Sequence, residues 1–147
     1  MKARPFDILL RDVKGEDCAA IVALLAELGY PHEPYFVAHK IEQLTGKRQD
    51  RLIVAAHGSE IVGLASMHIV PLLHLSGNVC RVTSLVVSHT HRRKHVGKRL
   101  LEAAEAYAKS NDCVKMEITS GDHRSDAHTF YEQVGYKEVS RRFIKMI

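Results

Sequence analysis

The N-terminal half of the chain shows a change from strand-like to helix-like spacing of its apolar residues. Residues 8–13 predict a first strand. Apolar positions at helical spacing within residues 17–28 and 36–45 predict two helices, with a proline-containing turn at residues 30–34 between them. Short apolar runs at residues 52–56 and 61–70, joined by a glycine-containing turn, predict a hairpin.

The C-terminal half continues with strands and helices in alternation. Residues 78–87 predict a strand, residues 97–109 a helix with one apolar stripe, and residues 114–118 a half-buried strand. Residues 127–134 predict a helix that ends at Gly135, and residues 136–146 predict a last strand. The resulting order, β-α-α-β-β-β-α-β-α-β, predicts one α/β domain over residues 1–147, with a core from about residue 7. Its mixed, mostly antiparallel sheet is expected to be flanked by helices.

Length and composition fit this single domain. The chain has 147 residues, of which 46% are hydrophobic and 26% charged, so it can bury a core and does not have the composition of a disordered segment. No apolar run approaches the roughly 20 residues of a membrane-spanning helix, and the N-terminus does not read as a signal peptide. Three cysteines without a Cys-x-x-Cys motif read as free thiols. These features predict a cytoplasmic protein with no membrane partner.

Positive charge is concentrated in the middle of the chain. Residues 61–101 contain six lysines and arginines but not one aspartate or glutamate, and five of the six cations fall within residues 92–99. Such a cluster attracts an anion, which here leaves open a phosphate-bearing cofactor, a nucleic acid or a membrane surface.

The basic cluster lies between a strand and a helix. The first turn of a helix presents unpaired N–H groups and the positive end of the helix dipole, which together stabilise a bound phosphate. Gly97 has no Cβ and so lets the backbone approach a ligand closely. A strand, a basic turn and a helix start therefore predict a pyrophosphate site.

Two segments resemble the signature motifs of the GNAT superfamily of N-acetyltransferases. The family pattern Arg/Gln-x-x-Gly-x-Gly/Ala corresponds to residues 92–97, RRKHVG, in which His95 replaces the first glycine. The family segment Ala-x-x-Phe/Leu-Tyr-x-x-x-Gly-Phe/Tyr corresponds to residues 127–136, AHTFYEQVGY. The predicted order of strands and helices also fits this family from end to end. Histidine is among the side chains better tolerated at unusual backbone angles, so the backbone of His95 can still contribute to a phosphate cradle.

This resemblance implies acetyl transfer from acetyl-CoA to the primary amine of an unidentified acceptor, without a metal. It implies Tyr131 as the general acid that protonates the departing thiolate, a task suited to a phenol with an ordinary pKa of about 10. It also implies that a backbone N–H near residues 85–87 polarises the acetyl carbonyl. The cofactor-binding residues predicted in this way are Leu85, Val86, Val87, Arg92, Arg93, Lys94, His95, Val96, Gly97, Lys98, Arg124 and His128.

The general base is not identified by the sequence. Many family members carry a glutamate at the position of Thr83, and a threonine hydroxyl cannot act as a base. The candidates elsewhere are His32, Glu33, Glu117 and a relay of water molecules.

Other functions stay open on the sequence alone. The chain fits a catalytically inactive coenzyme A-binding regulator, since the expected glutamate is missing. A nucleic-acid-binding module would use the cations of residues 92–99, but the chain has nine aromatic residues and none between Phe36 and Tyr107 to stack on bases. His89, His91 and His95 could be considered as metal ligands, but they lack the spacing of a helical zinc site. A homodimer is common in the family, and the sequence does not decide the oligomeric state.

Overall fold

A five-stranded sheet forms the centre of the protein, in a computed structural model that describes residues 6–119, 125–139 and 142–147. The strands lie side by side in chain order, the first four antiparallel and the last parallel to its neighbour. They are β1 (Leu9–Asp12), β2 (Asp50–His57), β3 (Glu60–Pro71), β4 (Asn78–Val87) and β5 (Cys113–Ile118). The predicted hairpin and the predicted mixed sheet are thus confirmed.

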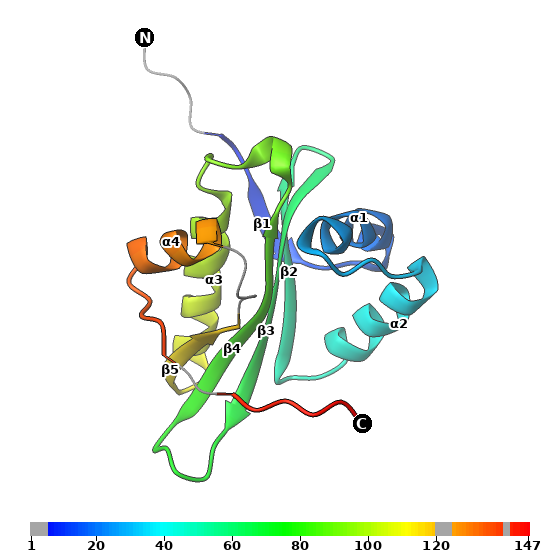
Figure 1. The fold of residues 1–147 in the computed structure, drawn as a ribbon. Helices are drawn as coiled ribbons and strands as arrows, with labels where there is room; N and C mark the ends of the chain where they lie inside the picture. Colours follow the sequence, from blue (N-terminus) through cyan, green and yellow to red (C-terminus); the bar gives the residue numbers. More distant parts are fainter. Residues whose placement is uncertain (1–5, 120–124, 140–141) are drawn as a thin grey trace.

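Helices cover both faces of the sheet. Helices α1 (Cys18–Leu28) and α2 (Pro34–Thr45) lie on one face, and α3 (Val96–Ser110) and α4 (Ser125–Gln133) lie on the other (Figure 1). Short 3-10 turns η1 (Gly15–Asp17) and η2 (His89–His91) precede α1 and α3. Within the described residues, no helix has the length and apolar character needed to cross a membrane.

The two layers bury separate hydrophobic clusters. One cluster joins α3 to the sheet, and the other joins α1 and α2 to the opposite face. Strand β3 contributes to both clusters, since Ala65 and Met67 face α3 while Leu64 faces α1 and α2. A strand that is buried on both faces reads as a nearly continuous apolar run, and residues 61–70 do so.

Gly63 on β3 sets how closely the start of α3 approaches the sheet. A Cβ at Gly63 would lie 3.0 Å from Cδ1 of Leu100 and 3.1 Å from Cγ1 of Val96, both on α3. These distances are shorter than ordinary van der Waals contact, so a side chain at this position would displace α3 or its side chains. The glycine therefore helps to position the helix start that follows the basic loop.

The strand predicted for residues 136–146 is wrong for the part of it that is described. Residues 136–139 and 142–147 belong to no strand, and Val139, Phe143, Ile144 and Met146 are largely exposed. A strand is stabilised by cross-strand partners and a buried face, and this segment has neither among the described residues. Its apolar composition suggested a strand, but composition does not supply a partner.

Candidate functional site

Strands β4 and β5 diverge halfway along β4. Their last paired residues are Val82 and Ile118, after which the N–H of Thr119 donates to the carbonyl of Val82 over 3.1 Å. Residues 83–87 of β4 therefore have no β5 partner among the described residues. Within this stretch, residues 85–87 were predicted to offer a backbone N–H to the acetyl carbonyl. Its side chains are divided between the two faces of the sheet, since Leu85 and Val87 pack toward α3 and Val86 toward α1.

A β-bulge lies where the two strands part. Ser66 of β3 is opposite Ser84, whereas the next residue, Met67, is opposite Val82. Thr83 is therefore the extra residue of the bulge. In a regular strand Thr83 and Ser84 would face opposite sides of the sheet, but here both side chains line the same cavity.

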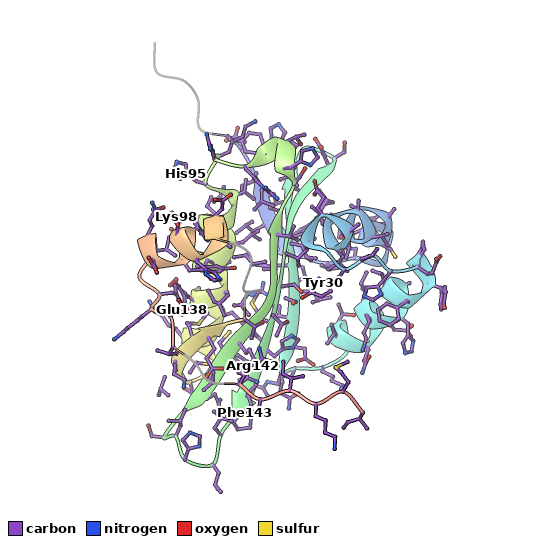
Figure 2. The ribbon with its side chains drawn as sticks, in the orientation of Figure 1. Tyr30, His95, Lys98, Glu138, Arg142 and Phe143 are labelled. Atoms are coloured by element: carbon purple, nitrogen blue, oxygen red, sulfur yellow. The ribbon has the colours of Figure 1, made fainter. Side chains whose placement is uncertain are left out.

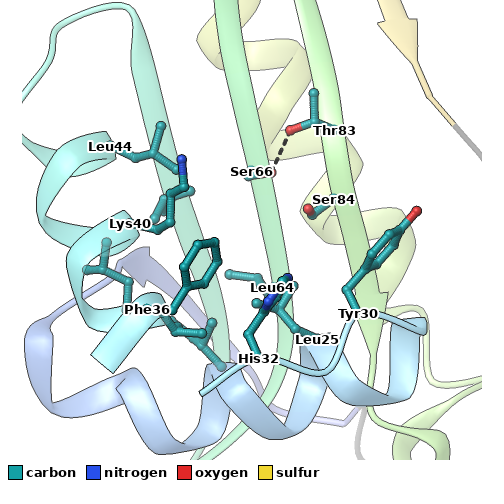
Figure 3. Close-up of a pocket in the computed structure, with 14 residues that line it drawn as sticks. Leu25, Tyr30, His32, Phe36, Lys40, Leu44, Leu64, Ser66, Thr83 and Ser84 are labelled. Atoms are coloured by element: carbon teal, nitrogen blue, oxygen red, sulfur yellow. Dashed lines mark hydrogen bonds between the residues drawn. The ribbon is translucent and has the colours of Figure 1, made fainter. Parts of the chain in front are cut away.

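That cavity of about 330 Å³ lies between α1, α2 and the sheet (Figure 3). Its walls are mostly apolar, and three hydroxyl groups, those of Ser66, Thr83 and Ser84, lie on the sheet side. Two groups capable of carrying positive charge, His32 and Lys40, come from the opposite side. The full lining consists of Ile21, Leu25, Tyr30, His32, Phe36, Val37, Lys40, Ile41, Leu44, Leu52, Leu64, Ser66, Thr83 and Ser84.

Two of these hydroxyl groups, those of Ser66 and Thr83, belong to a longer chain of hydrogen bonds. Ser66 Oγ and Thr83 Oγ1 are 2.8 Å apart, and Thr83 Oγ1 is 2.8 Å from Nε2 of His68. Nδ1 of His68 lies 2.7 Å from Oδ1 of Asp50. His68 and Asp50 are not among the site residues predicted from the sequence. A signal was present, because Leu64, Ser66 and His68 alternate on one face of a strand in which polar residues are rare.

The loop before α3 ends in a residue with a left-handed backbone conformation. His95 is the N-cap of α3 and adopts a left-handed conformation, with φ 63° and ψ 16°. The first intrahelical bond runs from the N–H of Arg99 to the carbonyl of His95. The N–H groups of Val96, Gly97 and Lys98 precede that bond and are not used within the helix. They form a set of donors at the positive end of a 15-residue helix.

Gly97 packs at the junction of three elements. A Cβ at Gly97 would lie 3.5 Å from Cζ of Phe130 on α4 and 3.7 Å from Cγ2 of Val87 on β4, which are ordinary contact distances. The fold by itself therefore has room for alanine here, in line with the Gly/Ala alternative in the family motif. The contact also shows that α4 lies beside the end of β4 and the start of α3.

The five cations of residues 92–99 are exposed, and within the described part of the chain none forms an ion pair with a carboxylate. Two of them contact the N-terminal segment. The ammonium of Lys94 lies 4.5 Å from the ring centre of Phe6, and Arg99 donates to the carbonyl of Ile8. Figure 2 shows His95 and Lys98 at the outer surface near the start of α3. Arg92, Arg93 and Lys98 are thus the cations that the structure leaves available for an anion.

Two histidines beside these cations, His89 and His91, have carboxylate partners from distant parts of the chain. Glu27 at the end of α1 contacts Nδ1 of His89 and also accepts from its backbone N–H. These hydrogen bonds hold the pKa of the Glu27 carboxyl below its usual range. Glu60 lies 3.7 Å from His91. No group of three histidine, cysteine or acidic side chains within the described ranges is arranged to hold a metal ion.

Tyr131 lies on α4, on the face of the sheet opposite the cavity. Its ring contacts those of Phe130 and Tyr136, with centroids 5.5 Å and 6.5 Å away. Phe130 in turn packs against Gly97, so Tyr131 belongs to the helix that flanks the diverging end of β4. The neighbouring phenol of Tyr136 is less suited to give up a proton, because burial raises its pKa well above 10.

The structure separates the base candidates that the sequence had grouped together. His32 lines the cavity and stacks on Phe36, whereas Glu33 is exposed beside it and does not line the cavity. Glu117 is held by Arg81 at 2.9 Å and by Lys115 at 3.2 Å. Burial raises the pKa of Glu117, but these hydrogen bonds outweigh burial and leave it lower than usual, which makes Glu117 a poor base.

The last two predicted cofactor residues are Arg124 and His128. Arg124 lies outside the described residues. His128 is half-buried on α4, and its predicted contact with the cofactor stays a prediction.

Replacing His95 with glycine is expected to raise the free energy of unfolding by about 1 kcal/mol, because a left-handed conformation is strained for every residue with a Cβ. Urea unfolding measures the gain. Since the backbone conformation is kept, affinity for acetyl-CoA should stay the same or increase. Asp112→Gly is a matched control, because Asp112 is also left-handed (φ 58°) but lies at the other end of α3. A loss of acetyl-CoA affinity in His95→Gly alone would contradict this account.

Comparison with known proteins identifies the family. The acetyltransferase (GNAT) family model matches residues 17–136. An aminoalkylphosphonate N-acetyltransferase from Salmonella typhimurium is 30% identical over 144 residues, which cover 94% of this chain and 90% of that protein.

Solved structures show the same fold. A transcriptional regulator from Bacillus halodurans C-125 superposes with a TM-score of 0.87 at 25% identity, covering 96% of this chain and 99% of that one. An aminoglycoside N-acetyltransferase in complex with CoA superposes with a TM-score of 0.86 at 15% identity, covering 100% and 99%. The second likeness concerns the fold alone.

Proposed function

Because this chain belongs to the acetyltransferase (GNAT) family and is an N-acetyltransferase, we propose that it acetylates the primary amine of a small, anionic acceptor, with acetyl-CoA as donor. One observation carries the proposal. Thr83 and Ser84, which line the cavity, are the first residues of β4 beyond its last pair with β5. An acceptor in the cavity and a thioester beside the unpaired part of β4 would therefore meet at the same stretch of strand.

The pyrophosphate of acetyl-CoA is assigned to the start of α3. The N–H groups of Val96, Gly97 and Lys98 offer donors, and the side chains of Arg92 and Arg93 add charge-assisted hydrogen bonds. The pantetheine arm then runs along the diverging end of β4, where residues 85–87 offer backbone N–H groups to the acetyl carbonyl.

The reaction is proposed to be a direct attack of the amine on the thioester carbonyl. The amine nitrogen forms a bond to the acetyl carbon, the bond from carbon to sulfur breaks, and Tyr131 gives its proton to the departing thiolate. The nitrogen then releases its surplus proton to solvent to leave the neutral amide, and Tyr131 regains a proton from solvent. The pKa values of two cysteine thiols support direct attack rather than a mechanism in which a cysteine is first acetylated. Burial raises the pKa of the Cys80 thiol to about 11 and also raises that of Cys113, so neither is a nucleophilic thiolate at neutral pH.

The lining of the cavity supports a small acceptor with an anionic group. Figure 3 places Lys40 and Phe36 on α2, across the cavity from the hydroxyl groups on the sheet. Lys40 hydrogen-bonds Gln43 at 3.4 Å and lies over the ring of Phe36, but within the described residues it has no carboxylate partner. An anionic group at Lys40 would direct the amine toward Ser66, Thr83 and Ser84. The Salmonella typhimurium relative is named for aminoalkylphosphonates, which carry both an amine and an anion.

The acceptor class is tested by thiol release from acetyl-CoA with pairs of acceptors of equal length. Each aminoalkylphosphonate is paired with an alkylamine that lacks the anionic group, and the phosphonate is expected to have the higher kcat/KM. Lys40→Met should raise KM for the phosphonate about tenfold, since it removes one charge-assisted contact, and should leave the alkylamine unchanged. A preference for the alkylamines would contradict the anionic acceptor but not the acetyl transfer.

A further inference from the structure

We propose that Ser66, Thr83, His68 and Asp50 form a proton relay that removes the proton of the acceptor's ammonium group, a role that rests on the proposed function. The amine must be neutral to attack the thioester, and the hydroxyl of Thr83 cannot itself act as a base. The relay would provide a base at some distance from that position. Ser66 is the member that would touch the acceptor, and His68 is the member that would hold the proton.

The fold brings these four side chains together from three strands. Asp50 of β2 and His68 of β3 are directly opposite in the antiparallel register, so their side chains share one face of the sheet. Ser66 is two residues before His68 and shares that face. The bulge in β4 leaves Thr83 without an opposite residue and turns its hydroxyl toward both.

The direction of each hydrogen bond follows from the acidic end of the relay. An ionised Asp50 carboxylate only accepts, so Nδ1 of a neutral His68 carries the proton and Nε2 is an acceptor. Thr83 must then donate to Nε2, and Ser66 must donate to Thr83. The oxygen of Ser66 keeps its remaining lone pairs for a hydrogen bond from the cavity. In this state the oxygen of Ser66 is available to take a proton from the ammonium group of the substrate.

Proton transfer reverses every hydrogen bond except the one to Asp50. The ammonium gives a proton to Ser66 Oγ as the Ser66 proton moves to Thr83 and the Thr83 proton moves to Nε2 of His68. The products are a neutral amine and an imidazolium paired with Asp50. The side chains of His68 and Asp50 are 23% and 16% exposed, so the proton can leave to water from the end of the relay away from the cavity.

The charges around His68 are compatible with this cycle. Asp50 faces it from β2, and Arg81 faces it from β4 as its opposite residue in the register. Arg81 is paired with Glu117 of β5, so its positive charge is largely balanced. Lys40 of α2 lines the same cavity. The C-terminal segment, which crosses this end of the sheet in the view of Figure 1, carries Arg142 and Lys145 among its described residues.

The test compares Thr83→Val with Thr83→Ser in pH profiles of kcat/KM for the acceptor. Valine keeps the shape of threonine but breaks the relay, so only acceptor that is already neutral in solution should react. For an alkylamine with a pKa of about 10, only about one molecule in 10³ is neutral at pH 7, so kcat/KM there should fall about 10³-fold and should approach the wild-type value as the pH rises to 10. Thr83→Ser keeps a hydroxyl and should restore the wild-type profile. His68→Gln should behave like Thr83→Val, and His74→Gln, in the exposed loop before β4, like wild type.

Each outcome has a distinct meaning. Loss by the same factor at every pH, or a wild-type profile in Thr83→Val, overturns the relay alone. Absence of acetyl transfer by the wild-type protein to every amine overturns the proposed function. NMR of the His68 ring nitrogens tests the relay without any acceptor: the neutral ring should carry its proton on Nδ1, and a proton on Nε2 would overturn the relay.

Discussion

Replacement of Tyr131 with phenylalanine is expected to lower kcat by about 10²-fold, with little change in the KM of either substrate. The phenol is proposed to protonate the departing thiolate, which happens only after the substrates have bound. Phenylalanine keeps the ring contacts with Phe130 and Tyr136, so the helix should stay in place. Steady-state kinetics with acetyl-CoA and a saturating acceptor measures the effect.

The control for this variant is Tyr35→Phe. Tyr35 lies on α2 with 78% of its surface exposed and does not line the cavity, so its hydroxyl should have no influence on kcat. An unchanged kcat in Tyr131→Phe would assign Tyr131 to packing. A raised KM with an unchanged kcat would assign it to substrate binding.

Reversing both charges in Arg92→Glu/Arg93→Glu is expected to weaken acetyl-CoA binding about 100-fold, because two charge-assisted contacts to the pyrophosphate are lost and replaced by repulsion. Both side chains are exposed, so the free energy of unfolding should change little. Calorimetric titration with acetyl-CoA measures the affinity, and the loss should be smaller at high salt, where charges are screened.

A matched charge reversal at Lys47 and Arg48 distinguishes a local effect of the basic loop on acetyl-CoA binding from an effect of the net charge of the protein. These two exposed cations lie before β2, at the opposite end of the sheet from the start of α3. Lys47→Glu/Arg48→Glu changes the net charge equally and should leave acetyl-CoA affinity close to wild type. Equal losses in the two double variants would show that the basic loop is not the pyrophosphate site.

Most of the fold was predictable because local patterns determined it. The apolar stripe of residues 97–109 and the alternation in residues 114–118 both produced the expected elements, as α3 and β5. The strand predicted for residues 136–146 was wrong because a strand depends on more than its own sequence. The segment does contain apolar residues, but a strand also needs a neighbouring strand, and sequence spacing does not show whether one is available.

The candidate site was only partly predictable. The helix start after the basic loop could be predicted, and with it the proposed phosphate site, because a loop followed by a helix start is contiguous in sequence. His68 and Asp50 were missed because their interaction depends on the pairing of β2 with β3 and on a bulge in β4. The bulge follows from no residue pattern in the chain, although it determines that Thr83 faces the cavity.

The measurement that tests the central claim most directly is a calorimetric titration of the wild-type protein with acetyl-CoA, with a short single-stranded DNA titrated under the same conditions. The account predicts micromolar binding of acetyl-CoA with one site per chain, and no binding of the DNA. Failure to bind acetyl-CoA would contradict the assignment of the start of α3 to the pyrophosphate. Binding of the DNA without binding of acetyl-CoA would indicate that the basic loop binds nucleic acid instead.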